Sequence, residues 1–269
     1  MFLGIGSYTF PWSVSAEESV EGRICFANKL LQYAAENNIR FVQLGDNLPL
    51  HEWSDDHLKS FKNNADRLNI QIQVGTRKLV AEHTRLYITL ASYFKSPFLR
   101  FVIDDNDFHP SVTEVIQQIR LLLPELQAAN VVLAIENHDR FPAKTLEEII
   151  LSTDPQSVGI CLDTANSLGA GEGIEHIVNV LAPYAVNLHI KDFVIRRVEH
   201  KMGFTIEGVT AGEGMLDIPW LVTVLKKTQR CETATLELWS NREKDLETSI
   251  VIEKMKVEKS LQYLKTVIV

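Results

Sequence analysis

Short apolar runs alternate with longer amphipathic segments along this chain. The runs are rich in Val, Ile, Leu and Phe, which is typical of parallel strands that are buried on both faces. We predict eight such strands, at Phe2–Ser7, Arg40–Leu44, Ile70–Gly75, Phe98–Ile103, Val131–Glu136, Val158–Asp163, Ala185–Ile190 and Thr233–Leu238.

The segments between these runs have helical periodicity. In Glu114–Leu126, apolar residues recur at spacings of three and four and form one stripe. Strands that alternate with helices indicate βαβ units with right-handed crossovers. The remaining predicted helices are Leu58–Leu68, Glu82–Phe94, Leu146–Leu151, Ile174–Leu181, Ile218–Leu225 and Leu246–Tyr263.

Eight units in 269 residues predict an α/β chain that forms a single (β/α)8 TIM barrel, with residues 1–269 as one domain. No glycine-rich linker or break in composition marks a second domain. An open, doubly wound sheet is the structural alternative.

The segment 191–217 is far longer than the usual connection of about two to six residues. It follows the seventh strand, so in a barrel it lies at the catalytic face. It contains Arg196, Arg197 and several glycines, which suit a phosphate site, but a mobile lid explains the glycines as well.

Composition narrows the classes of protein. The hydrophobic content of 45% is ordinary for a globular chain, and the net charge of −8 disfavours nucleic-acid partners. Three cysteines without a CxxC pair predict neither a disulfide framework nor a zinc knuckle. Because we find no signal peptide and no long apolar stretch, we expect a cytoplasmic protein without a membrane partner.

Residues that can bind metal stand at the ends of four successive predicted strands. They are Glu136, Asp163, His189 and Glu237. In a barrel these side chains converge on the axis at the C-terminal face. Three carboxylates so close together resist joint ionisation unless a cation neutralises them. The alternative for a single carboxylate is a helix N-cap or a solvated turn, and for His189 a satisfied core histidine.

The set predicts one divalent metal ion. Oxygen-rich sites suit Mg²⁺ or Mn²⁺, and an imidazole favours Mn²⁺, Co²⁺ or Zn²⁺, so we expect Mn²⁺ first. Open coordination positions would hold two adjacent substrate oxygens.

The motifs AIENHDRF, GICLDTANSLG, VNLHIKDF, GEGMLD and LELW contain these residues. In their order and spacing the chain resembles the xylose-isomerase-like superfamily of sugar phosphate isomerases and epimerases. Tagatose 3-epimerase, inosose dehydratase and endonuclease IV share this barrel. The resemblance implies that the four residues coordinate the metal and that Glu136 and Glu237 also move protons on opposite sides of a substrate carbon.

The sequence departs from the family pattern in two places. Asn166 stands where epimerases often have a histidine, which disfavours the multi-metal cluster of endonuclease IV. The arginine that follows the strand-seven histidine has no equivalent at the same spacing. We predict substrate contacts by His138, Asn166, Lys191, Arg196, Arg197 and Trp239, with Tyr8, Phe10, Trp12, Asp46, Thr76 and Arg77 as further candidates. A surface turn for His138, a solvated lysine for Lys191 and loop packing for Trp239 are the alternatives.

These observations predict a metal-dependent isomerase or epimerase that acts on a sugar, sugar phosphate or cyclitol. A metal-stabilised enediolate would serve epimerisation, isomerisation and, by loss of a β-hydroxyl, dehydration. The lyase is therefore the near alternative. An endonuclease IV-like repair enzyme and a non-catalytic sugar-binding barrel are the more distant ones. The sequence decides neither the identity of the substrate nor whether the protein forms a homo-oligomer.

Overall fold

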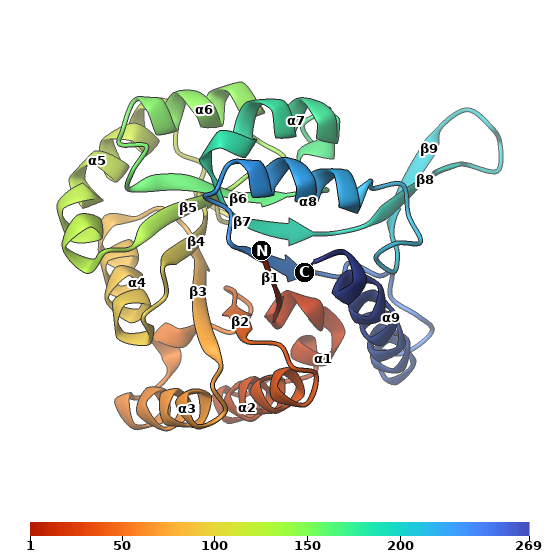
Figure 1. Ribbon diagram of the computed structural model, residues 1–269, viewed down its shortest axis with the longest axis horizontal. Helices are drawn as coiled ribbons and strands as arrows, with labels where there is room; N and C mark the ends of the chain where they lie inside the picture. Colours follow the sequence, from red (N-terminus) through yellow and green to blue (C-terminus); the bar gives the residue numbers. More distant parts are fainter. Residues whose placement is uncertain (269) are drawn as a thin grey trace.

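The computed structural model describes residues 1–268, and within them eight parallel strands close into a barrel (Figure 1). This confirms the predicted (β/α)8 architecture. Neighbouring strands around the ring follow the chain order, as right-handed βαβ units require. In ring order they are β1 (Phe2–Gly6), β2 (Phe41–Leu44), β3 (Gln71–Arg77), β4 (Phe98–Val102), β5 (Val132–Glu136), β6 (Val158–Asp163), β7 (Ala185–Ile190) and β10 (Thr233–Leu236).

The helices cover the outside of the barrel (Figure 1). Most agree with the predicted segments, but the short α1 and the long α2 were not predicted. Ser19 caps the first turn of α2, which buries Phe26, Leu30 and Leu31. None of the helices in residues 1–268 is long and apolar enough to cross a bilayer. The bounds are α1 (Pro11–Ser15), α2 (Val20–Glu36), α3 (Asp55–Arg67), α4 (Ala81–Phe94), α5 (Val112–Ala129), α6 (Ala143–Leu151), α7 (Ile174–Leu181), α8 (Ile218–Lys227) and α9 (Leu246–Val267).

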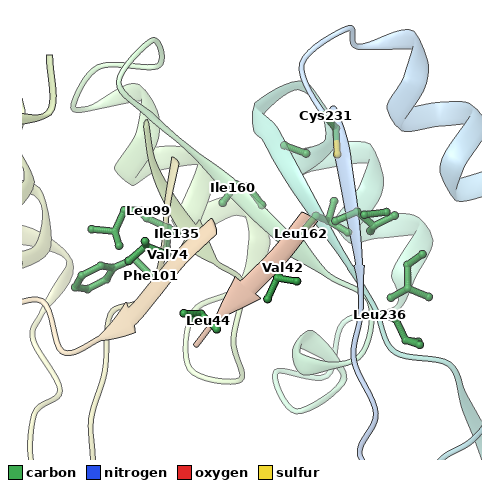
Figure 2. Packing of buried hydrophobic residues seen from close by; sticks show 14 of the residues in the cluster. Val42, Leu44, Val74, Leu99, Phe101, Ile135, Ile160, Leu162, Cys231 and Leu236 are labelled. Carbon is green, nitrogen blue, oxygen red and sulfur yellow. The ribbon is translucent and has the colours of Figure 1, made fainter. Parts of the chain in front are cut away.

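The apolar core lies mainly between the strands and the helices. Side chains of a strand alternate between the two faces of the sheet, so Val42 and Leu44 point one way and Gln43 the other. Gln43 bonds to Asn187 of β7, which is not a neighbouring strand, so Gln43 faces the barrel interior. Val42 and Leu44 therefore belong to the outer layer, together with buried residues such as Leu99 (Figure 2).

The segment after β7 is an ordered β-hairpin rather than an irregular loop. Strands β8 (Phe193–Arg197) and β9 (Phe204–Gly208) pair antiparallel and project from the barrel (Figure 1). A mobile lid or a phosphate site on this hairpin stays a prediction. In β9, Phe204 and Ile206 alternate with Thr205 and Glu207, which is the period of a strand.

Asp192 anchors the return of this hairpin to the barrel. Its buried carboxylate accepts hydrogen bonds from the backbone N–H groups of Gly212 (2.8 Å), Gly214 (3.0 Å) and Leu216 (3.2 Å). A buried carboxylate is stable when several donors satisfy it. Asp192 thus organises the chain that leads into α8 and does not face the barrel axis.

Candidate active site

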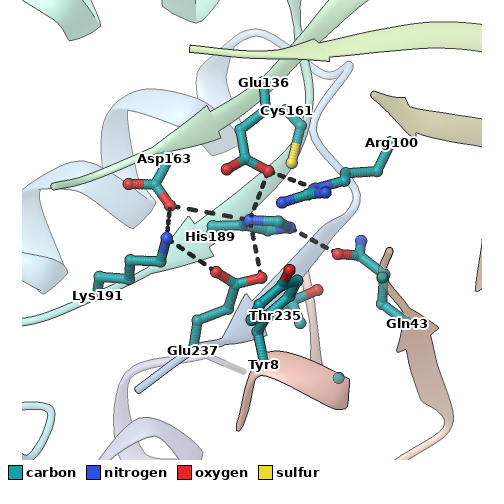
Figure 3. Close-up of polar contacts among 12 residues, drawn as sticks. Tyr8, Gln43, Arg100, Glu136, Cys161, Asp163, His189, Lys191, Thr235 and Glu237 are labelled. Carbon is teal, nitrogen blue, oxygen red and sulfur yellow. Dashed lines mark hydrogen bonds and ion pairs between the residues drawn. The ribbon is translucent and has the colours of Figure 1, made fainter. Parts of the chain in front are cut away.

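The structure brings together the four residues predicted to bind metal. Glu136 and Asp163 end β5 and β6, His189 lies in β7, and Glu237 directly follows β10. His189 Nδ1 lies 3.1 Å from Glu237 Oε1, 3.3 Å from Glu136 Oε2 and 3.9 Å from Asp163 Oδ2 (Figure 3). All four side chains are buried. They converge because parallel strands place their carboxyl ends at one end of the barrel.

The donor atoms fit a divalent cation. Ligand atoms of Asp163, His189 and Glu237 all lie within 4.8 Å of one another. Asp163 Oδ1 accepts from the N–H groups of Ala165 and Asn166, both at 2.8 Å, which turns Oδ2 toward the centre. Asp163 Oδ2 and His189 Nδ1 are buried without a hydrogen bond of good geometry. Buried polar atoms without partners are costly, and a metal ion would satisfy both.

Arg100 is a cation in this site that the sequence analysis did not identify. It lies in β4, and its Nε donates to Glu136 Oε2 at 2.5 Å while Nη1 donates to Asp46 Oδ1 at 2.7 Å. Burial raises the pKa of Glu136, but its charged neighbours, Arg100 first, outweigh this and hold the pKa well below its usual range. The signal in the sequence was a single arginine inside the otherwise apolar run FLRFV.

Lys191 supplies a second buried cation. Its Nζ lies 2.8 Å from Asp163 Oδ2, 3.1 Å from Glu237 Oε2 and 3.3 Å from Asn166 Oδ1. Burial lowers the pKa of Lys191, but Asp163 and Glu237 more than compensate and raise it. The ammonium group is therefore charged at neutral pH and partly balances the acidic ligands.

A small cavity opens over these residues. Tyr8 donates to Asp46 Oδ2 at 2.9 Å at one side of it. A larger hollow at the opposite end of the barrel is lined by strand starts such as Phe2 and Phe41, far from these ligands, so the smaller cavity is the candidate site. Its lining residues are Tyr8, Asp46, Arg77, Arg100, Val102, Glu136, His138, Lys191 and Glu237.

The predicted substrate contacts divide into two groups. Lys191 and His138 line the cavity, and Asn166, which is not among its lining residues, contacts one that is, because its Nδ2 donates to Glu136 Oε1 at 2.8 Å. Arg196 and Arg197 are exposed on the hairpin instead. Arg196 pairs with Glu207, and Arg197 stacks on Phe204, so their local partners hold them in β8–β9.

Trp239 also lies outside the cavity lining. Gly208 of the hairpin packs on its indole ring so closely that an added Cβ would lie 2.7 Å from Trp239 Cδ1. The ring therefore supports the hairpin, which agrees with the alternative of loop packing. A substrate contact by this residue stays a prediction.

Fold and site define a (β/α)8 barrel with an acidic, histidine-containing centre at the C-terminal ends of its strands. The family model of the xylose isomerase-like TIM barrel matches residues 31–267. The chain belongs to this family.

Known proteins match over nearly the whole chain. The 3-oxo-isoapionate decarboxylase of Pectobacterium atrosepticum is 29% identical over 266 residues, which cover 99% of this chain and 96% of the relative. D-psicose 3-epimerase from Clostridium cellulolyticum, solved with D-tagatose, superposes with a TM-score of 0.74 at 14% identity over 99% and 98% of the chains. A xylose isomerase-like barrel from Mycobacterium smegmatis, solved with magnesium, gives 0.68 at 12% identity over 91% and 90%.

Proposed function

We propose that this protein is a divalent-metal-dependent lyase that decarboxylates a small 3-oxo sugar acid. The charge of the cavity carries this proposal. Three basic residues, Arg77, Arg100 and Lys191, line it beside three acidic ones, Asp46, Glu136 and Glu237. Asp163 adds a fourth negative charge below, and a bound divalent cation would add two positive charges, so these seven side chains and the ion would together carry a net charge of about +1. An anionic substrate would balance this charge, whereas a neutral sugar would not.

Glu136, Asp163, His189 and Glu237 would hold the metal ion. When bound, it would supply a Lewis acid that stabilises negative charge on a substrate oxygen. Mn²⁺ is the ion we expect first, because the set combines three carboxylates with one imidazole. Mg²⁺, Co²⁺ and Zn²⁺ are the other candidates.

Arg77 would recognise the substrate carboxylate at the mouth of the cavity. Its side chain is 37% exposed and its Nη1 lies 3.7 Å from Asp46 Oδ2. Its Nε lies 3.6 Å from Asp105 Oδ1 and donates to the Asp104 carbonyl at 3.3 Å. Neither carboxylate forms a tight ion pair with Arg77, so its terminal nitrogens could bind the carboxylate of a substrate. Arg100 lies deeper, and its bonds to Asp46 and Glu136 keep the floor of the cavity rigid.

Lys191 would favour the chemical step. When the bond between the carboxylate and the neighbouring carbon breaks, CO₂ leaves and the electron pair moves onto the adjacent carbonyl oxygen. A fixed ammonium group in a buried site stabilises this charge without reorganisation. The carbon then takes up one proton, and the Lys191 ammonium and the Tyr8 hydroxyl are two proton-bearing groups of the cavity lining.

The engagement of Glu136 supports decarboxylation over proton abstraction. Both of its oxygens already accept hydrogen bonds, Oε2 from Arg100 and Oε1 from Asn166. A carboxylate held in this way is a weak base, and loss of CO₂ does not require a base to remove a C–H proton. The similarity of the whole chain to a 3-oxo-isoapionate decarboxylase agrees with this chemistry.

An isomerase or epimerase is the second candidate. Glu136 and Glu237 lie on two sides of His189, and both line the cavity (Figure 3). Two carboxylates in this arrangement suit proton removal from one face of a carbon and its return to the other. The D-psicose 3-epimerase solved with D-tagatose shares the fold.

NMR in D₂O distinguishes these functions. The reaction is run with the Mn²⁺-activated protein, and the metal is removed before the spectra are recorded. We expect 3-oxo-isoapionate or another 3-oxo aldonate to release one CO₂ and to gain one deuteron at the adjacent carbon. Arg77→Met should raise KM about tenfold or more, and the matched Arg85→Met on the outer face of α4 should not. Deuterium exchange into neutral ketoses, without CO₂ from any 3-oxo acid, would establish the epimerase instead.

A further inference from the structure

A layer of buried polar side chains lies inside the barrel beneath the metal ligands. Gln43, Gln73, Asn187 and Thr233 come from β2, β3, β7 and β10, and each is at most 4% exposed. The interior of such barrels is ordinarily filled by branched apolar side chains. Buried amides are costly unless every donor and acceptor is satisfied, so this layer requires a physical explanation.

The hydrogen bonds of this layer have a defined direction. Asn187 Nδ2 donates to the backbone carbonyl of Thr233 at 3.2 Å and to its hydroxyl at 2.8 Å. A carbonyl oxygen only accepts, so the amide nitrogen of Asn187 must face β10. Asn187 Oδ1 then faces Gln43 and accepts from Gln43 Nε2 at 3.2 Å. The Gln43 amide is thereby oriented as well.

Gln43 transmits this orientation to His189. Its Oε1 lies 2.7 Å from His189 Nε2, and Figure 3 shows this contact on the side of the ring that is remote from the carboxylates. Because Oε1 has no hydrogen, His189 Nε2 must be the donor. In a neutral imidazole the other nitrogen, Nδ1, then has the free lone pair that a metal requires.

We infer that Gln43 is a positioning residue that fixes the ring orientation and the tautomer of His189 for metal binding. The Thr233 carbonyl orients the amide of Asn187, and Asn187 in turn orients the amide of Gln43. Gln73 completes the layer, since it accepts from Gln43 Nε2 at 3.4 Å and donates to Thr233 Oγ1 at 3.0 Å, without contact to His189. The inference rests on the metal site of the proposed function.

Metal affinity tests this role independently of turnover. Gln43→Met keeps the length of the side chain but removes the acceptor, and we expect it to weaken Mn²⁺ binding about 10- to 100-fold in a competition titration with a chelator. The matched control is Gln73→Met, which removes a buried amide from the same layer. It should lower stability in urea to a similar extent but change Mn²⁺ affinity less than about threefold.

Glu237→Gln separates this inference from the proposed metal site. Normal Mn²⁺ affinity in Gln43→Met, together with a large loss in Glu237→Gln, would overturn the role of Gln43 and leave the metal site intact. If the wild-type protein itself does not bind Mn²⁺ stoichiometrically, the proposed function and this inference fail together.

The wild-type protein offers a test that does not depend on the folding of a variant. Long-range ¹H–¹⁵N spectra of the Zn²⁺-loaded protein, labelled at histidine, should show His189 protonated at Nε2 and metal-bound at Nδ1. His189→Asn identifies the resonance. Coordination through Nε2 would mean that the ring is turned away from Gln43, and the inference would then be wrong.

Discussion

Lys191 and Asp163 form a buried ion pair at the centre of the site, with Nζ 2.8 Å from Oδ2. The same Asp163 oxygen is one of the buried atoms without a hydrogen bond of good geometry. Lys191 therefore provides charge compensation but does not fully satisfy the carboxylate. A bound metal ion and the Lys191 ammonium group would together balance the charge of the Asp163 carboxylate.

Removal of the Lys191 charge should destabilise the metal-free protein most. Breaking one side of a buried pair costs on the order of 3 kcal/mol, because the remaining carboxylates are left without a counter-charge. We expect Lys191→Met to show this loss in urea denaturation with a chelator, and a clearly smaller loss with saturating Mn²⁺. The exposed pair of Lys144 and Glu147 provides the control, where Lys144→Met should cost less than about 1 kcal/mol. An equal loss for Lys191→Met with and without Mn²⁺ would contradict the shared role.

Metal addition should stabilise the folded protein by mass action. At a free Mn²⁺ concentration of about 100 times Kd, the free energy of unfolding should rise by about 2.7 kcal/mol. Asp163→Asn should abolish most of this gain, because Asp163 Oδ2 is one of the proposed ligands. Asp154→Asn, at a surface turn, should keep it. A Mn²⁺ response that is unchanged in Asp163→Asn would place the metal elsewhere.

Gly214 should be intolerant of a side chain. A Cβ at this position would lie 2.1 Å from Asp192 Oδ1 and 2.6 Å from the Phe193 carbonyl oxygen, so the Asp192 bonds that anchor the hairpin would have to break. We expect Gly214→Ala to lower the free energy of unfolding by about 2–4 kcal/mol. Gly203→Ala in the hairpin turn, where the nearest atom is 3.7 Å away, should stay within about 1 kcal/mol. Similar values for the two variants would disprove the anchoring role of Asp192.

Asp46 should contribute to the acid sensitivity of the fold. Burial raises its pKa, but Arg100 and Arg77 outweigh this, and the net pKa is lowered. A lowered pKa in the folded state adds stability above the unfolded value of 3.8, and this stability is lost as the pH falls through the folded pKa. Urea denaturation of the metal-free protein between about pH 7 and pH 3 should therefore show a smaller loss for Asp46→Asn than for the wild type. A parallel decline of both proteins would exclude this contribution.

The barrel and the acidic centre could be predicted from the sequence because both follow from local patterns. Val158–Asp163 reads as a buried strand from its own residues, and its last position marks the catalytic end of any barrel. Glu136, His189 and Glu237 follow by the same rule. Parallel strands of similar length must place such residues together.

The environment of these residues was decided only by the tertiary structure. Arg100 meets Glu136 across 36 positions, and Gln43 meets His189 across 146. The sequence shows that a polar residue stands inside an apolar strand. It does not show the partner of that residue, which depends on which strands close the ring and in what register. The sequence likewise showed that Arg196 and Arg197 follow the seventh strand. It did not show that a hairpin carries both side chains away from the barrel. Local sequence thus determined which groups stand at the strand ends, while long-range packing decided which of them touch.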